Sequence, residues 1–148
     1  MFIVTCQSNA VRAGCLVGFA TQCGIEPPRY LVCLSIANRT YEIADSASGL
    51  AVHILTKKNE ALAALFGQNT GDDIDKFEGV SWRPGVTGAP ILTDCSTSFE
   101  GHVIAKIPFG DHVGFVLTPI EDLDADKSLD GRQLTLRDVK SFEPGHPA

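Results

Sequence analysis

The amino-acid sequence predicts a mainly β protein, in which antiparallel strands form a closed or nearly closed barrel decorated by two or three short helices. Three observations predict this fold class. Short apolar runs rich in Val, Ile, Phe and Thr recur along the chain, and Gly and Pro residues separate them. Apolar residues at helical spacing are concentrated in two segments.

Six strands are expected, each from a short apolar run bounded by polar or turn-forming residues. The first run ends at polar residues, the third follows a Glu-Pro-Pro turn, and the last two flank a Phe-Gly-Asp turn that predicts a long hairpin. The expected strands cover residues 2–6, 14–21, 30–36, 51–55, 98–107 and 112–120.

Two helices are expected between these strands. Residues 41–48 follow residue types that cap helix N-termini, and Gly49 is a suitable C-terminal stop. Residues 58–66 place alanines, leucines and a phenylalanine at helical spacing and end at Gly67. A third short turn is expected between residues 70 and 77.

The chain of 148 residues is long enough for one domain with its own core. Hydrophobic residues make up 44% and charged residues 20%, a balance that argues against disorder. We therefore expect residues 1–148 to form a single domain. Residues 122–148 are expected to be a polar tail of this domain, with one short strand near residues 134–136.

The net charge of −6 argues against nucleic acid as a partner, because affinity for nucleic acid depends on Lys and Arg neutralising phosphates. No apolar run reaches the roughly 18 residues that a membrane helix needs. The N-terminus has neither a basic leader nor a long apolar stretch. We therefore expect a cytoplasmic protein without a membrane partner.

The cysteines and histidines predict neither a redox dithiol nor a metal site. The five cysteines form no Cys-x-x-Cys pair, and the four histidines show no ligand spacing. Buried free thiols are the expected state of most of these cysteines. The residues considered are Cys6, Cys15, Cys23, Cys33, Cys95, His53, His102, His112 and His146.

Three stretches, taken in order, resemble a known family. The first is residues 12–22 (RAGCLVGFATQ), followed by a Glu-Pro-Pro turn. The second runs through residues 66–92 and includes FG, DKFEGV, a tryptophan, PG and GAP. The third is Gly-Asp-His at residues 110–112, leading into a strand. Their order and spacing resemble the flavin reductase-like, FMN-binding split β-barrel family over most of residues 1–120.

Family membership implies a homodimer with the flavin at or near the subunit interface. It also implies, for many members, NAD(P)H-dependent reduction of FMN or FAD, often to supply reduced flavin to a partner monooxygenase. Other members hold flavin and pass electrons. These properties are implied by the resemblance and not by composition or periodicity.

The resemblance implies that the strand at residues 14–21 lies along the flavin ring and ribityl chain. Glycines there let the backbone approach a ligand closely. The family usually carries a Thr at the position of Leu16 and a Ser or Asn at that of Gly18, and this chain departs from both. From the residues alone, a plain barrel strand with two glycines explains the pattern better. The candidate flavin-binding residues in this strand are Gly14, Cys15, Leu16, Val17, Gly18, Phe19 and Thr21.

Two segments are candidates for binding the flavin phosphate. Asn38, Arg39 and Thr40 follow a strand and open a helix, where N–H groups, a guanidinium and a hydroxyl suit a phosphate. Without the resemblance, helix capping beside a solvated Arg explains these residues. Lys76 offers a second positive charge, although a surface Lys is nearly as good a reading. Phe77 either covers part of the ring or packs into the core.

His112 is the candidate for chemistry, because the matching family His lies near the flavin where nicotinamide docks. Hydride passes directly from nicotinamide to flavin, so the protein mainly positions the two rings and balances charge. A solvent-exposed turn His is the alternative reading. The chain has no Gly-x-Gly-x-x-Gly fingerprint, no Gly-x-Ser-x-Gly elbow and no phosphate-binding loop.

The expected function is that of an FMN-binding oxidoreductase, an NAD(P)H-dependent flavin reductase that uses FMN, with FAD or coenzyme F420 as the other candidate cofactors. A non-enzymatic flavin-binding electron carrier, a deazaflavin (F420)-dependent reductase and a barrel serving as an interaction module are the alternatives. The departures at Leu16 and Gly18 keep these alternatives open.

Overall fold

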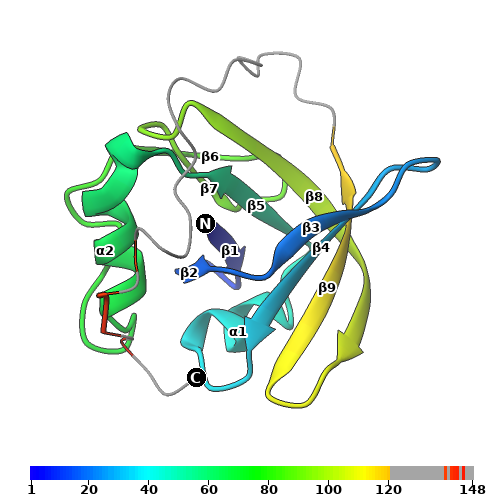
Figure 1. Cartoon of the computed structure of the whole chain (residues 1–148), viewed down its shortest axis with the longest axis horizontal. Coiled ribbons are helices and arrows are strands. Elements are labelled where there is room, and N and C mark those ends of the chain that lie inside the picture. The colour runs from blue at the N-terminus through cyan, green and yellow to red at the C-terminus, as the bar shows by residue number, and fades with distance from the viewer. Residues whose placement is uncertain (121–138, 140, 144, 146–148) are drawn as a thin grey trace.

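The computed structural model describes residues 1–120, 139, 141–143 and 145 of the chain. Its main feature is a seven-stranded sheet of order β2-β1-β5-β8-β9-β4-β3, in which neighbouring strands are antiparallel. This sheet curls into a half-barrel, and the two-stranded sheet β6–β7 lies beside it (Figure 1). The mainly β, antiparallel fold class predicted from the sequence is therefore confirmed.

The elements follow one another in an order close to the predicted one. They are β1 (Phe2–Ser8), β2 (Val11–Val17), β3 (Ala20–Gly24), β4 (Arg29–Ser35), α1 (Arg39–Ala44), β5 (Gly49–Ile54), the 3₁₀ turn η1 (Lys57–Asn59), α2 (Glu60–Gln68), β6 (Trp82–Pro84), β7 (Pro90–Leu92), β8 (Thr97–Pro108) and β9 (His112–Pro119).

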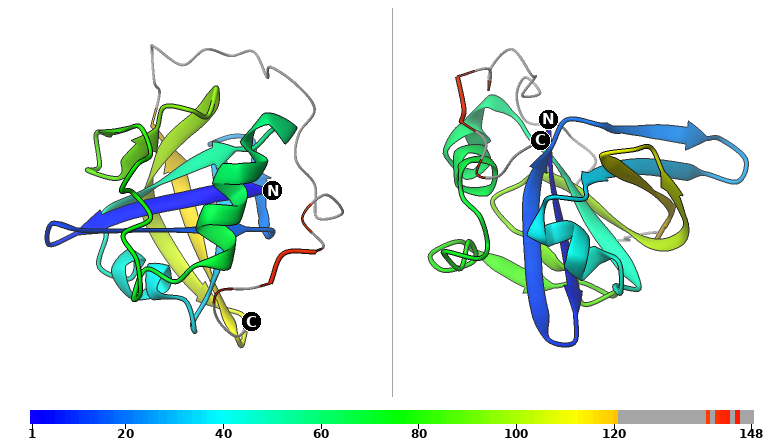
Figure 2. Two further views of the ribbon diagram at one scale, coloured as in Figure 1. Left: turned by 90° about the vertical axis from the view of Figure 1, so that its left-hand side faces the viewer. Right: turned by 90° about the horizontal axis from the view of Figure 1, so that it is seen from below.

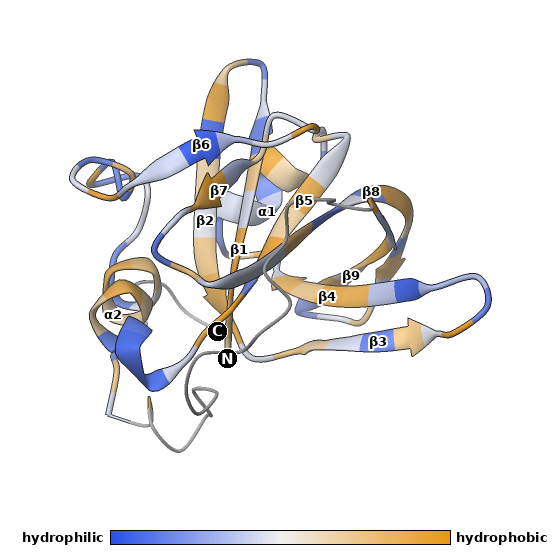
Figure 3. Ribbon diagram, turned by 90° about the horizontal axis from the view of Figure 1, so that it is seen from above, coloured by the Kyte–Doolittle hydropathy of each residue, from blue (hydrophilic) through white to orange (hydrophobic). Residues whose placement is uncertain are grey.

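The second predicted strand, residues 14–21, is wrong as a single element. β2 ends at Val17 and β3 begins at Ala20, and these two strands lie at opposite edges of the sheet order. The chain passes from one edge to the other at Gly18 and Phe19. The β3–β4 hairpin then projects beyond the body of the molecule (Figures 2 and 3).

Both helices differ from their predicted bounds at their glycines. α1 ends at Ala44, and Gly49 is the first residue of β5. Gly67 lies inside α2, where an added Cβ would come within 2.8 Å of the Leu16 side chain. This glycine therefore permits close helix–strand packing. The turn expected between residues 70 and 77 forms hydrogen-bonded turns and no helix.

Strands β6 and β7 were not predicted, because three-residue strands bounded by prolines lack a visible alternation. The turn that joins them is held by the buried carboxylate of Glu100, which accepts from the backbone N–H groups of Val86 (2.7 Å) and Thr87 (2.9 Å). A Cβ on Gly85 would overlap this carboxylate, so glycine is required there.

The core consists of two main clusters, one on each side of strands β1 and β2. The first lies within the curl of the sheet and includes Val4, Cys15 and Phe115. The second lies between β1, β2 and α2 and includes Ile3 and Phe66. Both clusters are well filled by large apolar side chains, which fixes the position of β2 between them.

His53 joins the sheet to the β6–β7 ribbon. Its ring is fully buried, with Nδ1 3.0 Å from the Ile3 carbonyl oxygen and Nε2 accepting from the Leu92 backbone N–H at 2.9 Å. Because Nε2 accepts, the proton of the neutral ring lies on Nδ1 and is donated to Ile3. Burial lowers the pKa of His53 from 6.5 to about 4.

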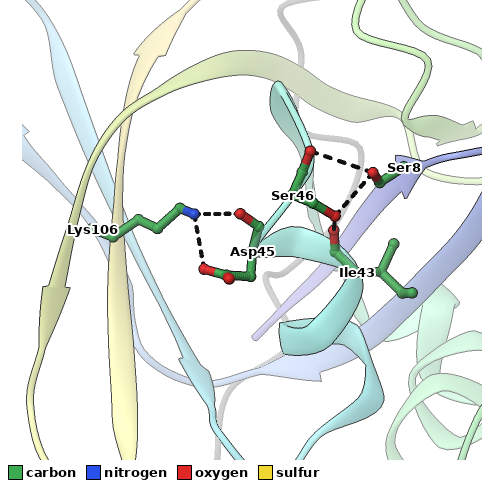
Figure 4. A network of polar contacts seen from close by, with 5 residues as sticks. All are labelled: Ser8, Ile43, Asp45, Ser46 and Lys106. Carbon is green, nitrogen blue, oxygen red and sulfur yellow. Dashed lines mark hydrogen bonds and ion pairs between the residues drawn. The ribbon is translucent and has the colours of Figure 1, made fainter.

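α1 is fixed at its C-terminal end by contacts from β8 and β1 (Figure 4). The Lys106 ammonium donates to the Asp45 carbonyl and lies 2.8 Å from the Asp45 carboxylate. The hydroxyl of Ser46 donates to that of Ser8 at 3.0 Å. Since α1 has no basic residue in its last turn, Lys106 supplies the positive charge that favours a helix C-terminus.

The expected polar tail, residues 122–148, lies largely outside the described residues, and so does the strand expected near residues 134–136. Of its described residues, Val139 and Phe142 pack against the second core cluster. The Gly145 backbone N–H donates to the Gly67 carbonyl at 3.1 Å. These described residues therefore cover part of the α2 surface.

Candidate functional site

A pocket of about 510 Å³ opens beside the N-terminal half of β2. Its wall is built from β2, the first turn of α1 and the loop that follows α2, and it carries three cationic and three acidic side chains. The lining residues are Ala10, Val11, Arg12, Ala13, Gly14, Arg39, Thr40, Gly71, Asp72, Asp73, Ile74, Asp75, Lys76 and Phe77.

The first turn of α1 brings Arg39 and Thr40 to the pocket. Asn38 precedes them in extended conformation, and its side-chain oxygen accepts from the Thr40 N–H at 2.9 Å. This bond satisfies one of the free N–H groups of the helix start. Asn38 is buried and lies outside the pocket lining, so its side chain acts as a helix cap here.

Arg39 is paired across the pocket mouth with Asp72. Its Nη1 lies 2.6 Å from Oδ1 of Asp72, and the Thr70 hydroxyl donates to Oδ2 of the same carboxylate at 3.0 Å. The hydrogen bonds from Arg39 and then Thr70 lower the pKa of Asp72. Both partners of the ion pair are substantially exposed to solvent.

Arg12 forms a second ion pair at the pocket edge. Its Nη2 lies 2.6 Å from Oδ2 of Asp75, and this bond lowers the pKa of Asp75. The guanidinium carbon also lies 5.0 Å from the Trp82 ring centroid and 5.4 Å from that of Phe77. Two aromatic rings and one carboxylate therefore hold the Arg12 side chain in place.

Lys76 has a buried ammonium group that joins β2 to α2. It is 5% exposed, and its Nζ donates to the carbonyls of Gly14 (3.2 Å) and Phe66 (3.1 Å). Burial lowers the pKa of Lys76. Among the described residues, the Lys76 ammonium has these two hydrogen-bond acceptors, and the side chain lines the pocket. Its neighbour Phe77 packs in the second core cluster.

From residue 13 to residue 17, the side chains of β2 are committed to the two core clusters. Cys15 and Val17 lie in the first cluster, and Leu16 packs against the second, above Gly67. A Cβ at Gly14 would lie 2.8 Å from the Phe66 ring, so this glycine makes room for a core aromatic. Along residues 13–17, β2 therefore presents mainly its backbone outside the cores.

His112 and Phe19 form a separate group beyond the pocket lining. Their ring centroids are 5.4 Å apart in an edge-to-face arrangement, and Nδ1 of His112 lies 3.0 Å from the Asp111 carboxylate. The His112 side chain is 20% exposed, and its hydrogen bond lowers the pKa of Asp111. Gly18 lies at the crossing beside Phe19 and is exposed, whereas Thr21 lies on the exposed β3 strand.

The structure thus brings five of the residues proposed from the sequence into one pocket, namely Gly14, Arg39, Thr40, Lys76 and Phe77. Arg12 and the acidic residues of the 71–75 loop were not predicted as site residues from the sequence. A signal was present, because Arg12 alternates with Gly14 along one strand and Asp75 directly precedes Lys76.

Two negative findings apply to the described residues, 1–120 and the five near the C-terminus. No group of three or more His, Cys, Asp or Glu side chains among them is placed to hold a metal ion. No helix in this part of the chain is long and apolar enough to cross a membrane.

A family model described as a flavin reductase like domain matches residues 1–140. The chain is 31% identical over 110 residues to FMN reductase (NADH) RutF of Bradyrhizobium diazoefficiens, covering 74% of this chain and 61% of that protein. It is 30% identical over 134 residues to a flavin-dependent monooxygenase reductase subunit, HsaB of Mycobacterium tuberculosis, covering 86% and 70%.

Among solved structures, an FMN-binding protein from Thermus thermophilus with bound 1-cyclohex-2-enone superposes with a TM-score of 0.79. The match covers 97% of this chain and 75% of that one at 21% identity, so it shows a shared fold. The match to RutF covers 61% of that protein, so this chain spans less than two thirds of the length of this relative.

Proposed function

The chain belongs to the flavin reductase like domain family, and from this premise we propose that it binds FMN in the pocket beside β2 and reduces it with NAD(P)H. The observation that carries this proposal is the meeting of Arg39, Thr40 and Lys76 in one pocket, since they come from two distant segments of the chain. A relative named FMN reductase (NADH) supports the same choice of cofactor and reductant.

The donor set of the pocket fits a phosphate monoester. Arg39 offers a planar fork of N–H donors, Thr40 a hydroxyl and Lys76 its ammonium group. The bound flavin would supply the hydride acceptor, a capacity that the amino-acid side chains lack. The part played by the chain is to hold the phosphate end and to keep the β2 backbone fixed between two cores.

We place the nicotinamide end of the site at His112 and Phe19. The His112 imidazole is half-buried, held by Asp111 and packed against the Phe19 ring, so its orientation is defined before a ligand arrives. In this arrangement His112 would hydrogen-bond the nicotinamide carboxamide or balance the charge of the reduced cofactor.

We further propose that this end of the molecule meets a second copy of the chain. Exposed apolar side chains surround His112: Phe19 is 64% exposed, Ile36 50% and Phe109 53%. Backbone hydrogen bonds place Ile36 beside Asp111 and Phe109 beside His112. Burial of these side chains in a homodimer would remove apolar surface from water.

A partner monooxygenase in the cytoplasm is the proposed destination of the reduced flavin. The name of the Mycobacterium relative, a reductase subunit of a flavin-dependent monooxygenase, supports a partner of this kind. The five cysteines are free thiols, which fits a reducing compartment.

The test is titration of the protein with FMN, followed by quenching of flavin fluorescence, together with NAD(P)H oxidation monitored by absorbance. Arg39→Ala should weaken FMN binding by about tenfold or more, because a charge-assisted hydrogen bond to phosphate is lost. Arg29→Ala is the matched control, since Arg29 donates to the Pro28 carbonyl and lies outside the pocket.

Each outcome of this titration has a defined meaning. Equal dissociation constants for the two Arg variants would remove Arg39 from the site. Tight FMN binding without NAD(P)H turnover would indicate an electron carrier. Turnover with F420 in place of FMN would indicate the deazaflavin reductase.

A further inference from the structure

The loop that follows α2 places a carboxylate directly on Arg39, one of the cations of the proposed phosphate site. Asp72 Oδ1 lies 2.6 Å from Arg39 Nη1. Both the Arg39 guanidinium and the buried Lys76 ammonium act electrostatically on Asp72 and lower its pKa. The loop also packs directly on the Arg39 side chain, because a Cβ at Gly71 would lie 3.1 Å from Arg39 Cδ.

We propose that Asp72 is a built-in anion that occupies the phosphate position on Arg39 and is displaced when a dianionic phosphate monoester binds. This inference rests on the proposed function, since it concerns the same pocket. On this proposal Asp72 selects ligands by their charge, whereas the cationic residues of the pocket bind them.

The geometry of the loop suits such an exchange. The Asp72 N–H donates to the Thr70 hydroxyl at 3.2 Å, and that hydroxyl donates back to Asp72 Oδ2 at 3.0 Å. These bonds hold the carboxylate within its own turn, and they survive when the turn moves away from Arg39. The Asp72 side chain is 60% exposed, and exposed ion pairs of this kind contribute a factor of about five or less to an equilibrium.

Charge decides which ligand can replace Asp72. The pocket carries Arg12, Arg39 and Lys76 against Asp72, Asp73 and Asp75, so its formal charges balance. A neutral ligand gains nothing from Arg39 that would offset the loss of the Asp72 pair. A phosphate dianion carries more charge than the carboxylate it replaces and accepts bidentate hydrogen bonds from a guanidinium. The pocket therefore favours phosphorylated ligands over their unphosphorylated forms.

The matched pair of variants is Asp72→Asn and Asp73→Asn. Both remove one negative charge from the wall of the same pocket, but only Asp72 forms an ion pair with Arg39 among the described residues. Asn at position 72 keeps the side-chain shape and can still accept from Thr70. The ligands are FMN and riboflavin, which differ by the phosphate group, and binding is followed by flavin fluorescence.

We expect Asp72→Asn to tighten FMN binding about three- to fivefold and to leave riboflavin binding within about twofold of wild type. We expect Asp73→Asn to change FMN binding by less than about twofold. FMN affinity of Asp72→Asn equal to or below that of wild type would overturn the proposal. Equal gains in the two variants would also overturn it, because a general charge effect would then explain the result.

Inorganic phosphate separates failure of this inference from failure of the flavin proposal. If neither FMN nor riboflavin binds to any variant, the proposed flavin function is wrong. Titration with inorganic phosphate, followed by backbone amide NMR signals, then tests whether phosphate displaces Asp72 from Arg39. Saturation of Asp72→Asn at lower phosphate concentration than wild type and Asp73→Asn would support the exchange. Identical phosphate curves for the three proteins would refute it.

Discussion

His53 makes the stability of the fold depend on pH in a range where exposed carboxylates are still charged. Its ring is fully buried as the neutral form, donating to Ile3 and accepting from Leu92, and its pKa is lowered from 6.5 to about 4. Below pH 6.5 the unfolded chain therefore binds a proton at His53 that the folded protein does not. The free energy of unfolding must fall as the pH falls from 6.5 towards 4.

The size of this effect follows from the two pKa values. Linkage between them gives a loss of about 2–3 kcal/mol between pH 7.5 and pH 4.5, and about 3 kcal/mol in total. This is a large part of the 5–15 kcal/mol that typical domains possess. The first contact to weaken should be the bond to Leu92, which holds the β6–β7 ribbon on the sheet.

The assay is urea unfolding of wild type and His53→Gln at several pH values between 7.5 and 4.5, followed by fluorescence of the single tryptophan, Trp82. Gln does not titrate, so the variant should be less stable at pH 7.5 by about 1–3 kcal/mol but should lose less stability on acidification. All other titrating groups are common to both proteins and cancel in the difference.

Equal losses of unfolding free energy in wild type and His53→Gln between pH 7.5 and pH 4.5 would contradict a buried, neutral His53. Should the variant fail to fold, NMR titration of the wild-type imidazole signals gives an independent reading. The His53 signal is expected to shift near pH 4, and a midpoint near 6.5 would contradict the buried, neutral ring.

Two further predictions concern packing and the fixation of α1. Gly14→Ala should lower stability by about 1–3 kcal/mol, because the added Cβ would lie 2.8 Å from the Phe66 ring, and an unchanged thermal midpoint would show that Phe66 moves aside at no cost. Lys106→Met should lower stability by about 0.5–1 kcal/mol in low salt and by less in high salt, because its pair with Asp45 is partly exposed (Figure 4). A loss of several kcal/mol, unaffected by salt, would contradict the second estimate.

The strand pattern was readable from the sequence wherever a run was long and apolar. The long hairpin of β8 and β9 was predicted to within one residue at each of its four strand ends, because the alternation is sustained and the turn residues are distinctive. The break at Gly18 and Phe19 was missed, since apolar residues continue through it without a strong turn signal.

Several glycines have roles that the sequence does not reveal. Gly49 and Gly67 were read as helix stops, which is the commonest use of glycine after a helical pattern. In the structure Gly49 opens a strand and Gly67 lies within α2 against Leu16. A glycine can end a helix, or it can let a neighbouring element pack closely against the backbone. Which of the two applies depends on the residues that lie next to the glycine in the folded structure.

In the candidate site, too, some features were predicted from the sequence and others were found in the structure. Arg39 and Lys76 were identified as phosphate-binding candidates from residue type and from the family resemblance. Their ion-pair and hydrogen-bond partners, Asp72 for Arg39 and two backbone carbonyls for Lys76, became visible when the loop after α2 was placed against β2. Arg12 was likewise identified as a site residue from its position in the pocket lining.

By itself, the sequence determined the mainly β fold class, the approximate strands and the family, because period, turn residues and motif order are local properties of a chain. Tertiary structure decided which charges face one another, which glycines accept a neighbour and which strands form the two edges of the sheet. These features depend on contacts between residues distant in sequence, such as Arg12 with Asp75 and Arg39 with Asp72. Such contacts form when the β2 strand is packed between two cores.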